Sequence, residues 1–334
     1  MQTQIQSKMG EIMKTMQITS LDGPDAMEFA DVAAPVAGSD QVLIKVHAAG
    51  ASFPQLLQTR GLYHVKPPLP YAPGCEVAGE IVSAPKGSRF APGDRVAALP
   101  MIGKIPMIGG FAELAVATAD MTFALPKEIS FVEAASLPLN YLTAYFALIE
   151  RGGMAPGESV LVQGAAGGIG TASIQIAKAF GASRVIAVTS TPEKGAAAIA
   201  AGADKYVLVD GFSGAVKELG SVDIVVDPVG GNRLTDSLRT LKEGGRLLVV
   251  GFTSGEIPTV QVNRLLLNNI SVVGVGFVPE RHRHLQAEWE AIMPHVRSGT
   301  LKPVIGATYA LNDAAVALRE IDQRRAVGKI VLTV

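Results

Sequence analysis

The chain has 334 residues, about twice the size of a common domain, and its 29 basic and 30 acidic side chains leave a formal net charge of −1. This balance, without a local block of lysine and arginine, argues against nucleic-acid binding, and 48% apolar with 18% charged residues is typical of a well-packed folded chain. A single cysteine excludes an internal disulfide and any multi-thiolate metal site.

Residues 1–12 lack the apolar core of a secretory signal. No stretch of the chain approaches the roughly eighteen continuous apolar residues of a membrane span. We therefore expect a cytoplasmic protein that has no membrane contact. Residues 1–12 are interpreted either as a loose leader or as residues upstream of a start at Met13.

The first part of the chain, from about residue 13 to 127, has short apolar runs of period two between Gly, Pro and Asp clusters, which predicts an irregular β-rich region. The proline-dense residues 66–74 predict a stiff loop, because proline lacks the amide donor that a helix needs. Residues 131–151 have helical spacing, and Pro138 predicts a break within them.

A different pattern begins at Ser159. Short runs rich in β-branched residues predict strands at 159–163, 184–188, 206–209, 223–226 and 246–250, with helical segments at 171–180 and 192–201 between the early ones. This alternation implies parallel strands joined by right-handed crossovers, hence an α/β fold with a Rossmann-type, doubly wound parallel sheet. Residues 270–275 would form the last strand of that sheet, and residues 330–333 a terminal strand that rejoins the first region.

A glycine-rich turn, residues 164–170 (GAAGGIG), follows the first of these strands and opens a helix. Residues with little or no side chain let a pyrophosphate approach the helix N-terminus, so this turn predicts a dinucleotide site. The cofactor contacts would come from Ala166, Gly167, Gly168 and Ile169. Ala165 replaces the first glycine of the G-x-G-x-x-G fingerprint, and an ordinary glycine-rich turn is the alternative.

The end of the second strand indicates which nicotinamide cofactor binds. An enzyme that favours NAD usually has an acidic residue there, but this chain has Thr189. Ser190 and Thr191 offer hydroxyl donors, and Lys194 offers a charge to a 2′-phosphate. The sequence therefore favours NADPH, although Lys194 could simply be solvated and Glu193 keeps NAD open.

Further segments carry a family resemblance: residues 60–70 (RGLYHVKPPLP), 73–79 (PGCEVAG), 93–96 (GDRV), 109–113 (GGFAE), 139–144 (LNYLTA) and 227–231 (DPVGG). With the glycine-rich turn, they resemble the medium-chain dehydrogenase/reductase superfamily, specifically its zinc-free, NADPH:quinone oxidoreductase-like branch. The resemblance implies a β-rich GroES-like catalytic domain, residues 1–131 and 279–334. A dinucleotide-binding Rossmann domain, residues 132–278, would be inserted into it.

Zinc-dependent members place a cysteine, a histidine and a second cysteine ligand at the positions that we align with Ser52, Cys75 and Leu139. All three differ here, so the resemblance implies that no metal is bound, and Cys75 is expected to be a small buried side chain. His282 and His284 stand between arginines in an expected surface turn, where we expect them to face solvent.

The resemblance also implies site residues. Tyr63 is the preferred hydrogen-bond or proton donor, with packing of its ring in the proline-rich loop as the alternative. Ser52 would bond the nicotinamide ribose or the substrate oxygen, and Asn140 and Thr143 would lie near the nicotinamide, although Asn140 is equally well explained as a helix cap. Further cofactor contacts are expected after the fifth and sixth strands, from Gly251, Phe252, Thr253, Val275 and Phe277.

Without a metal, hydride reduction is feasible for acceptors that are already electrophilic, such as quinones and α,β-unsaturated carbonyls. We expect an NADPH-dependent reductase of such small molecules. The alternatives are an enoyl-thioester reductase, with Arg281, Arg283 and Lys302 as candidates for a basic entrance, and a crystallin-like cofactor-binding protein with little turnover.

Two expectations concern surfaces. Met101, Ile102, Met107 and Ile108 lie in a loop that either covers an apolar substrate or packs on its own domain. The run 270–275 would be an exposed sheet edge, where members of the family pair, so a homodimer is expected.

Overall fold

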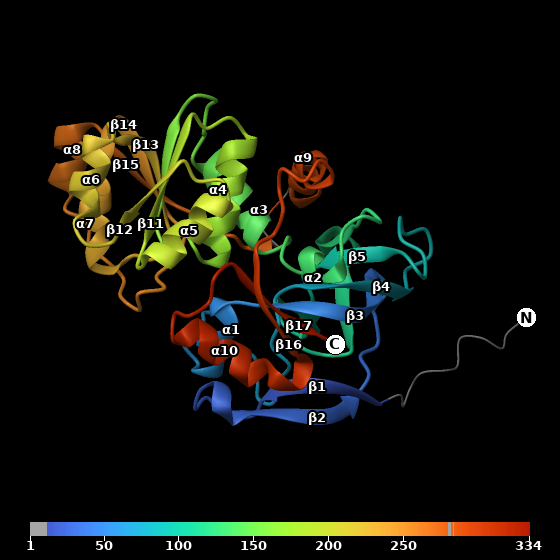
Figure 1. Ribbon diagram of the computed structural model, residues 1–334. Helices are drawn as coiled ribbons and strands as arrows, with labels where there is room; N and C mark the ends of the chain where they lie inside the picture. Colours follow the sequence, from blue (N-terminus) through green and yellow to red (C-terminus); the bar gives the residue numbers. More distant parts are fainter. Residues whose placement is uncertain (1–11, 280–281, 283) are drawn as a thin grey trace, which may run out of the picture. The chain divides into compact units, whose positions relative to one another are not determined.

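The computed structural model describes residues 12–279, 282 and 284–334, which fall into two compact units (Figure 1). Among the described residues, one unit is 12–139 with Ile305–Val334, and the other is formed from the stretch Asn140–Val304. The sequence predicted domain boundaries at 131/132 and 278/279, whereas these compact units meet at 139/140 and 304/305. Helix α9 (Leu285–Arg297) accounts for the second difference, because it contacts α3 (Asn140–Tyr145).

Of the segment interpreted as a leader, residues 1–11 lie outside the described range. Ile12 is the first residue of strand β1 (Ile12–Ile18), which pairs in antiparallel fashion with β2 (Met27–Ala33). Within the described chain, no helix combines the length and the apolar character needed to cross a bilayer.

The first unit contains, in its described residues, a nine-stranded sheet. Its strands are β3 (Gln41–Ala51), β4 (Val77–Ser83), β5 (Arg95–Ala98), β6 (Met101–Ile102), β7 (Ile105–Pro106), β8 (Leu114–Thr118), β9 (Thr122–Ala124), β16 (Ile305–Ala310) and β17 (Lys329–Thr333). The path β7-β6-β8-β3-β4-β5-β9 is joined by β17, which pairs with β3 so that Ile330 faces Ala51. The prediction that the terminal strand rejoins the first region is therefore confirmed.

The helical segments of this unit are α1 (Phe53–Thr59), α2 (Phe131–Ala134), α10 (Ala314–Asp322) and the short η1 (Pro24–Ala26), η2 (Ala119–Met121) and η6 (Leu311–Asp313). The proline-rich residues 66–74 contain no helix, as predicted, and Tyr71 forms a bridge with Ile18. In the Met/Ile loop, Ile108 is fully buried in the core of this unit. This part of the loop therefore packs on its own domain, which is the second of the two alternatives.

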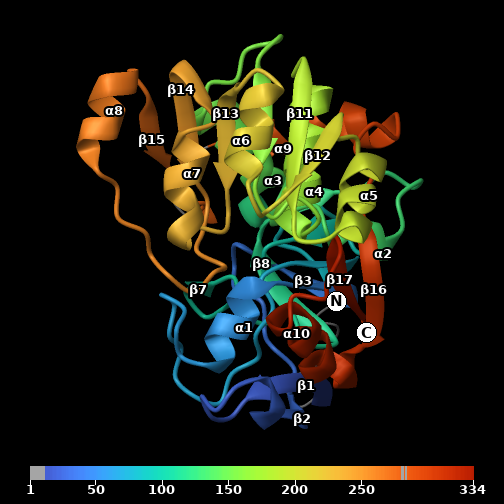
Figure 2. The ribbon, with the colours of Figure 1, turned by 60° about the vertical axis from the view of Figure 1, so that its left-hand side comes forward.

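The second unit is built on a six-stranded parallel sheet, counted in its described residues, with the order β12-β11-β10-β13-β14-β15. Its strands are β10 (Ser159–Val162), β11 (Arg184–Thr189), β12 (Lys205–Leu208), β13 (Val222–Asp227), β14 (Leu241–Val249) and β15 (Ser271–Gly274). Figure 2 shows β12 and β15 as the two outer strands. This order is that of the Rossmann fold, so the predicted fold class is confirmed.

The helices around this sheet are α3, α4 (Gly168–Ala179), α5 (Pro192–Ala200), α6 (Phe212–Glu218), α7 (Leu234–Leu238), α8 (Val262–Asn268), α9 and the one-turn η4 (Gly231–Arg233). Helix α3 continues directly into a π-helix, η3 (Phe146–Arg151), and the predicted break lies between α2 and α3. Val160, Leu161 and Val162 of the central strand β10 are fully buried, as expected where helices cover both faces of a sheet.

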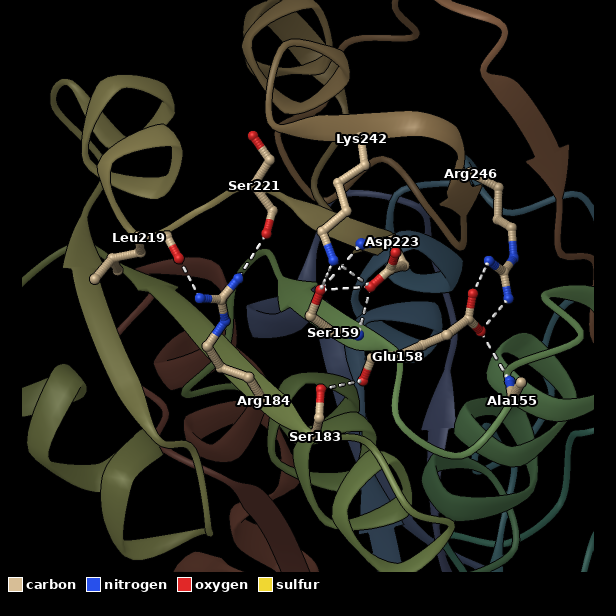
Figure 3. Close-up of polar contacts among 10 residues, drawn as sticks. All are labelled: Ala155, Glu158, Ser159, Ser183, Arg184, Leu219, Ser221, Asp223, Lys242 and Arg246. Carbon is tan, nitrogen blue, oxygen red and sulfur yellow. Dashed lines mark hydrogen bonds and ion pairs between the residues drawn. The ribbon is translucent and has the colours of Figure 1, made fainter.

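Charged side chains tie the strands together where they begin (Figure 3). The Asp223 carboxylate accepts hydrogen bonds from the Ser159 hydroxyl at 2.6 Å and from the Lys242 ammonium at 2.9 Å. Partial burial would raise the pKa of Asp223, but these bonds outweigh it and lower the pKa to about 2. Beside them, the Arg246 guanidinium binds both oxygens of Glu158 at 2.6 Å. These contacts fix the amino ends of β10, β13 and β14, opposite the edge at which ligands bind to such sheets.

Candidate functional site

The turn between β10 and α4 leaves the start of α4 open to a ligand. Gly164 has a φ of +58°, and a Cβ on Gly170 would lie closer than 3.0 Å to the Gly164 carbonyl oxygen, so a glycine is required at both positions. The N-cap residue of α4 is Gly167, and no described side chain caps this end. Backbone N–H groups of the first helical turn are therefore available to an anion, and the helix dipole favours negative charge there.

Asn140 and the glycine-rich turn lie together within the second unit. Asn140 is the first residue of α3 and is buried, and a Cβ on Gly168 would come within 2.5 Å of its Nδ2 atom. Thr143 lies one turn further along the same helix and is also buried. The Tyr141 hydroxyl donates to Gln175 Oε1 at 2.7 Å, which fastens α3 to α4. A side chain larger than glycine at position 168 would displace the Asn140 amide.

The end of β11 has a second turn that leads into a helix. Thr189 ends the strand, is buried, and donates its hydroxyl hydrogen to the Thr191 carbonyl at 3.3 Å. Thr191 is the N-cap of α5, where its hydroxyl oxygen accepts the Lys194 N–H at 3.3 Å. Ser190 is exposed and Lys194 is half-buried. Hydroxyl groups and one cation therefore stand where the acidic residue of an NAD site is missing.

The turn after β13 is fixed by a buried carboxylate. Asp227 Oδ1 accepts the N–H groups of Val229 at 2.8 Å and Gly230 at 2.9 Å, while Oδ2 is buried without a partner among the described residues. Burial raises the pKa of Asp227 despite these bonds. A Cβ on Gly230 would lie 2.8 Å from the Phe252 ring, so this turn and residues 251–253 pack closely. Gly251, Phe252 and Thr253 are half-buried and follow the carboxyl end of β14.

The segment after β15 contains the remaining predicted cofactor residues. The Val275 N–H donates to the Val249 carbonyl at 2.9 Å, and the Phe277 ring lies 5.0 Å from the His282 ring, between centroids. We expected His282 to face solvent, but the structure contradicts this. Its side chain is only 9% exposed, and its Nε2 atom lies 3.0 Å from Glu288 Oε1. The acidic partner on α9 compensates the burial of the imidazole. His284 is exposed.

In the first unit, Ser52, Gln55 and Cys75 form a chain of hydrogen bonds. Ser52 is the N-cap residue of α1, and its N–H donates to Gln55 Oε1 at 2.8 Å. Gln55 Nε2 donates to Cys75 Sγ at 2.6 Å, and the thiol donates to the Met107 carbonyl at 3.2 Å. Cys75 is fully buried, and burial, with the nearby Glu76 charge, raises the pKa of its thiol. The thiol is therefore protonated at neutral pH.

The same Ser52 is bound to a buried ion pair that sequence reasoning missed. The Lys329 ammonium donates to both Ser52 Oγ and Glu76 Oε1, and Glu76 Oε2 accepts the Leu139 N–H at 2.8 Å. The side chains of Lys329 and Glu76 are 4% and 0% exposed. A Cβ on Gly50 would lie 2.5 Å from Glu76 Oε1, so the glycine leaves the room that this carboxylate occupies. The available signal was the acidic residue in the otherwise uncharged run PGCEVAG.

Tyr63 lies in the loop that follows α1. It is half-buried, and its ring centroid is 4.2 Å from that of His64. Its ring is not among the buried core residues of the unit. Along the chain, Ser52 directly precedes α1 and Tyr63 follows it, and both residues are half-buried.

Comparison with known proteins gives two family models, "Alcohol dehydrogenase GroES-like domain" over residues 38–127 and "Zinc-binding dehydrogenase" over residues 168–298. The quinone oxidoreductase of Homo sapiens is 33% identical over 96% of this chain and 98% of its own length. The chain belongs to the quinone oxidoreductase branch of the medium-chain dehydrogenase/reductase family. It is accordingly an oxidoreductase.

Two solved structures are similar to this chain in fold as well as in sequence. A probable oxidoreductase from Mycobacterium abscessus is 39% identical, with a TM-score of 0.87 over 97% of this chain and 99% of that one. The quinone oxidoreductase from Thermus thermophilus, described with its NADPH complex, is 34% identical, with a TM-score of 0.83 over 96% and 100%. Both likenesses cover nearly the whole chain, so both units follow the family pattern.

Proposed function

We propose that the protein is an NADPH-dependent, zinc-independent oxidoreductase that transfers hydride to quinones or other activated, α,β-unsaturated carbonyl compounds. The observation that carries this proposal is the open N-terminus of α4 in a parallel sheet of Rossmann order. Backbone N–H groups and the helix dipole at such an end bind pyrophosphate. The names of the relatives support the acceptor class, and the NADPH complex of the Thermus thermophilus protein supports the cofactor.

The choice of NADPH over NADH depends on the turn after β11. Thr189 stands where an acidic residue would be, so no carboxylate there would repel a 2′-phosphate, and its buried hydroxyl is bonded to the Thr191 carbonyl. Ser190 is exposed and Lys194 stands in the first turn of α5, where a phosphate gains both a hydroxyl donor and a positive charge. The exposed Glu193 is the feature that favours NAD.

A bound nicotinamide cofactor would supply the hydride, and the chain would supply position and hydrogen bonds. Ala166, Gly167, Gly168 and Ile169 would hold the pyrophosphate through backbone groups. Residues 251–253, Val275 and Phe277 would contact the nicotinamide half, together with Asn140 and Thr143. Reduction of a carbonyl-bearing acceptor places negative charge on its oxygen, and Tyr63 and Ser52 are the hydroxyl donors proposed to stabilise that charge.

The donor set at the positions of the zinc ligands does not fit zinc. Cys75 is a protonated thiol bonded to Gln55 and Met107, and Leu139 has no ligand atom in its side chain. Ser52 accepts a hydrogen bond from an ammonium group, which places a positive charge where a cation would need electron pairs. Among the described residues, no three His, Cys, Asp or Glu side chains could together hold a metal ion. These contacts support hydride transfer without a metal.

Two other functions are compatible with the same fold, and they differ from the proposed one in the substrate that is reduced. An enoyl-thioester reductase would need a basic entrance; Lys302 is exposed, and Arg281 and Arg283 lie outside the described residues. A crystallin-like binder would bind NADPH and oxidise it with no acceptor. No contact in the described structure favours either of them over the reductase.

We also propose that the protein is a homodimer in the cytoplasm. Val262, Leu266 and Leu267 of α8 are 74%, 77% and 77% exposed, and this helix directly precedes the outer strand β15. An apolar surface beside an unpaired strand edge favours pairing with a second copy. We propose the cytoplasmic location because the single cysteine is buried and is not in a disulfide.

The test of the function is NADPH oxidation by the purified protein with quinones, enals and crotonyl thioester, repeated with NADH. The proposal requires turnover with quinones or enals and a preference for NADPH. Selective turnover of the thioester would support the enoyl-thioester alternative, and NADPH binding without turnover of any acceptor would support the crystallin-like one. Equal or better use of NADH would contradict the 2′-phosphate assignment.

A further inference from the structure

The first unit contains a buried ion pair, and the role that we infer for it rests on the proposed function. Lys329 and Glu76 are almost completely inaccessible, and a buried ion pair is not by itself a strong source of stability, because both ions lose hydration. Three separate segments nevertheless contribute to it. Gly50 on β3 leaves room for the Glu76 carboxylate, Leu139 donates its N–H to Glu76, and Lys329 is the first residue of β17. Lys329 also donates a hydrogen bond to Ser52 Oγ.

That contact determines the direction of the Ser52 hydroxyl. An ammonium group has three donors and no acceptor, so Ser52 Oγ must accept from Lys329 through a lone pair. The hydroxyl hydrogen consequently cannot point at Lys329. The backbone N–H of Ser52 is already bonded to Gln55. Ser52 is half-buried whereas Lys329 and Glu76 are buried, so its hydroxyl hydrogen is the donor that this network offers to a ligand.

We propose that Lys329, held by Glu76, is a positioning residue that makes Ser52 a directed and strengthened hydrogen-bond donor to the carbonyl oxygen of the bound acceptor. The positive charge beside Oγ polarises the O–H bond and favours donation to an oxygen that gains negative charge. The proton stays on Ser52 and the ammonium keeps its three hydrogens, so the effect is on the stability of the developing charge. The ammonium thus stands among the positions at which zinc-dependent relatives place their ligands.

The perturbation must remove the charge without leaving a buried carboxylate unpaired. The double variant Glu76→Gln/Lys329→Met does this, because the amide oxygen of the introduced glutamine can still accept the Leu139 N–H and the methionine side chain matches the length of the lysine stem. Ser52→Ala removes the donor itself. Lys242→Met is the matched control, since it removes a lysine from an ion pair at the amino end of the second unit's sheet.

The readouts are kcat and KM for a quinone and an enone, the NADPH dissociation constant, and the melting temperature. We expect the double variant to fold, to bind NADPH within about twofold of wild type, and to lose about 10- to 100-fold in kcat/KM, mostly in kcat. Ser52→Ala should lose a similar factor. The triple variant Ser52→Ala/Glu76→Gln/Lys329→Met should lose no more than the larger of these two factors. The reason is that both changes remove the same hydrogen bond to the acceptor. Lys242→Met should keep wild-type kcat.

Lys329→Arg serves as the conservative rescue, since it keeps a buried cation beside Glu76, and it should recover part of the rate that the double variant loses. Wild-type kcat in a folded double variant would overturn the proposal, and so would losses that multiply in the triple variant. In both cases the wild-type enzyme is active and the proposed function survives. A wild-type chain that reduces no acceptor would overturn the proposed function and this inference together.

Discussion

A single methyl group in the glycine-rich turn should weaken cofactor binding. In Gly170→Ala the new Cβ would lie closer than 3.0 Å to the Gly164 carbonyl oxygen and 2.6 Å from two backbone atoms of Ala165. All three contacts are with backbone, so no side-chain rotation relieves them, and the turn must move relative to α4. Overpacking of this kind costs about 1–3 kcal/mol. Because the displaced groups are those proposed to hold the pyrophosphate, we expect the NADPH dissociation constant to rise at least about tenfold.

Gly214→Ala is the matched control. Gly214 lies in helix α6, and a Cβ there has no neighbour within 4 Å. Alanine in a helix interior should leave stability unchanged or raise it by about 0.5–1 kcal/mol. The assay is a fluorescence titration with NADPH, paired with thermal unfolding of both variants. Folded Gly170→Ala protein with wild-type affinity would refute the assignment of this turn to the pyrophosphate.

Three further predictions concern single residues. Tyr63→Phe should lower kcat and leave NADPH affinity almost unchanged, and normal turnover by this variant would remove Tyr63 from the mechanism. Lys194→Met should weaken the binding of NADPH but not of NADH, since it removes a partner of the 2′-phosphate. Equal losses of affinity for the two cofactors would contradict that role. Asp223, whose pKa is about 2 in the folded chain, should stabilise the protein by roughly 2 kcal/mol above its unfolded pKa of about 4. The difference in unfolding free energy between wild type and Asp223→Asn should therefore shrink as the pH falls from about 4 to about 2, and a constant difference would argue against this ion pair.

The parallel sheet could be predicted because its central strands are short, buried and β-branched. Val160 and Val162 of β10 mark such a strand directly, and the following glycines mark the turn. Strand β14 begins at Leu241, five residues before the predicted start, because Lys242, Glu243 and Gly244 do not have a strand pattern. These residues are exposed at the amino end of the sheet, where polar side chains are tolerated.

The features that could not be predicted depend on contacts between distant segments. Lys329 and Glu76 are 253 residues apart, and nothing near either residue indicates the other. The place of α9 (Leu285–Arg297) in the second unit depends on its packing on α3, which no local pattern reveals. The burial of His282 depends on Glu288, which a pattern of two histidines between arginines does not indicate.

We propose that a bound dinucleotide reduces an electrophilic acceptor on this chain without a metal. The most direct measurement is single-turnover NADPH oxidation by protein whose metal content has been removed by chelation and checked by elemental analysis. We expect a quinone or enone to be reduced at the same rate before chelation, after chelation and after zinc is added back. A rate that is lost on chelation and returns in proportion to one bound zinc ion per chain would contradict it.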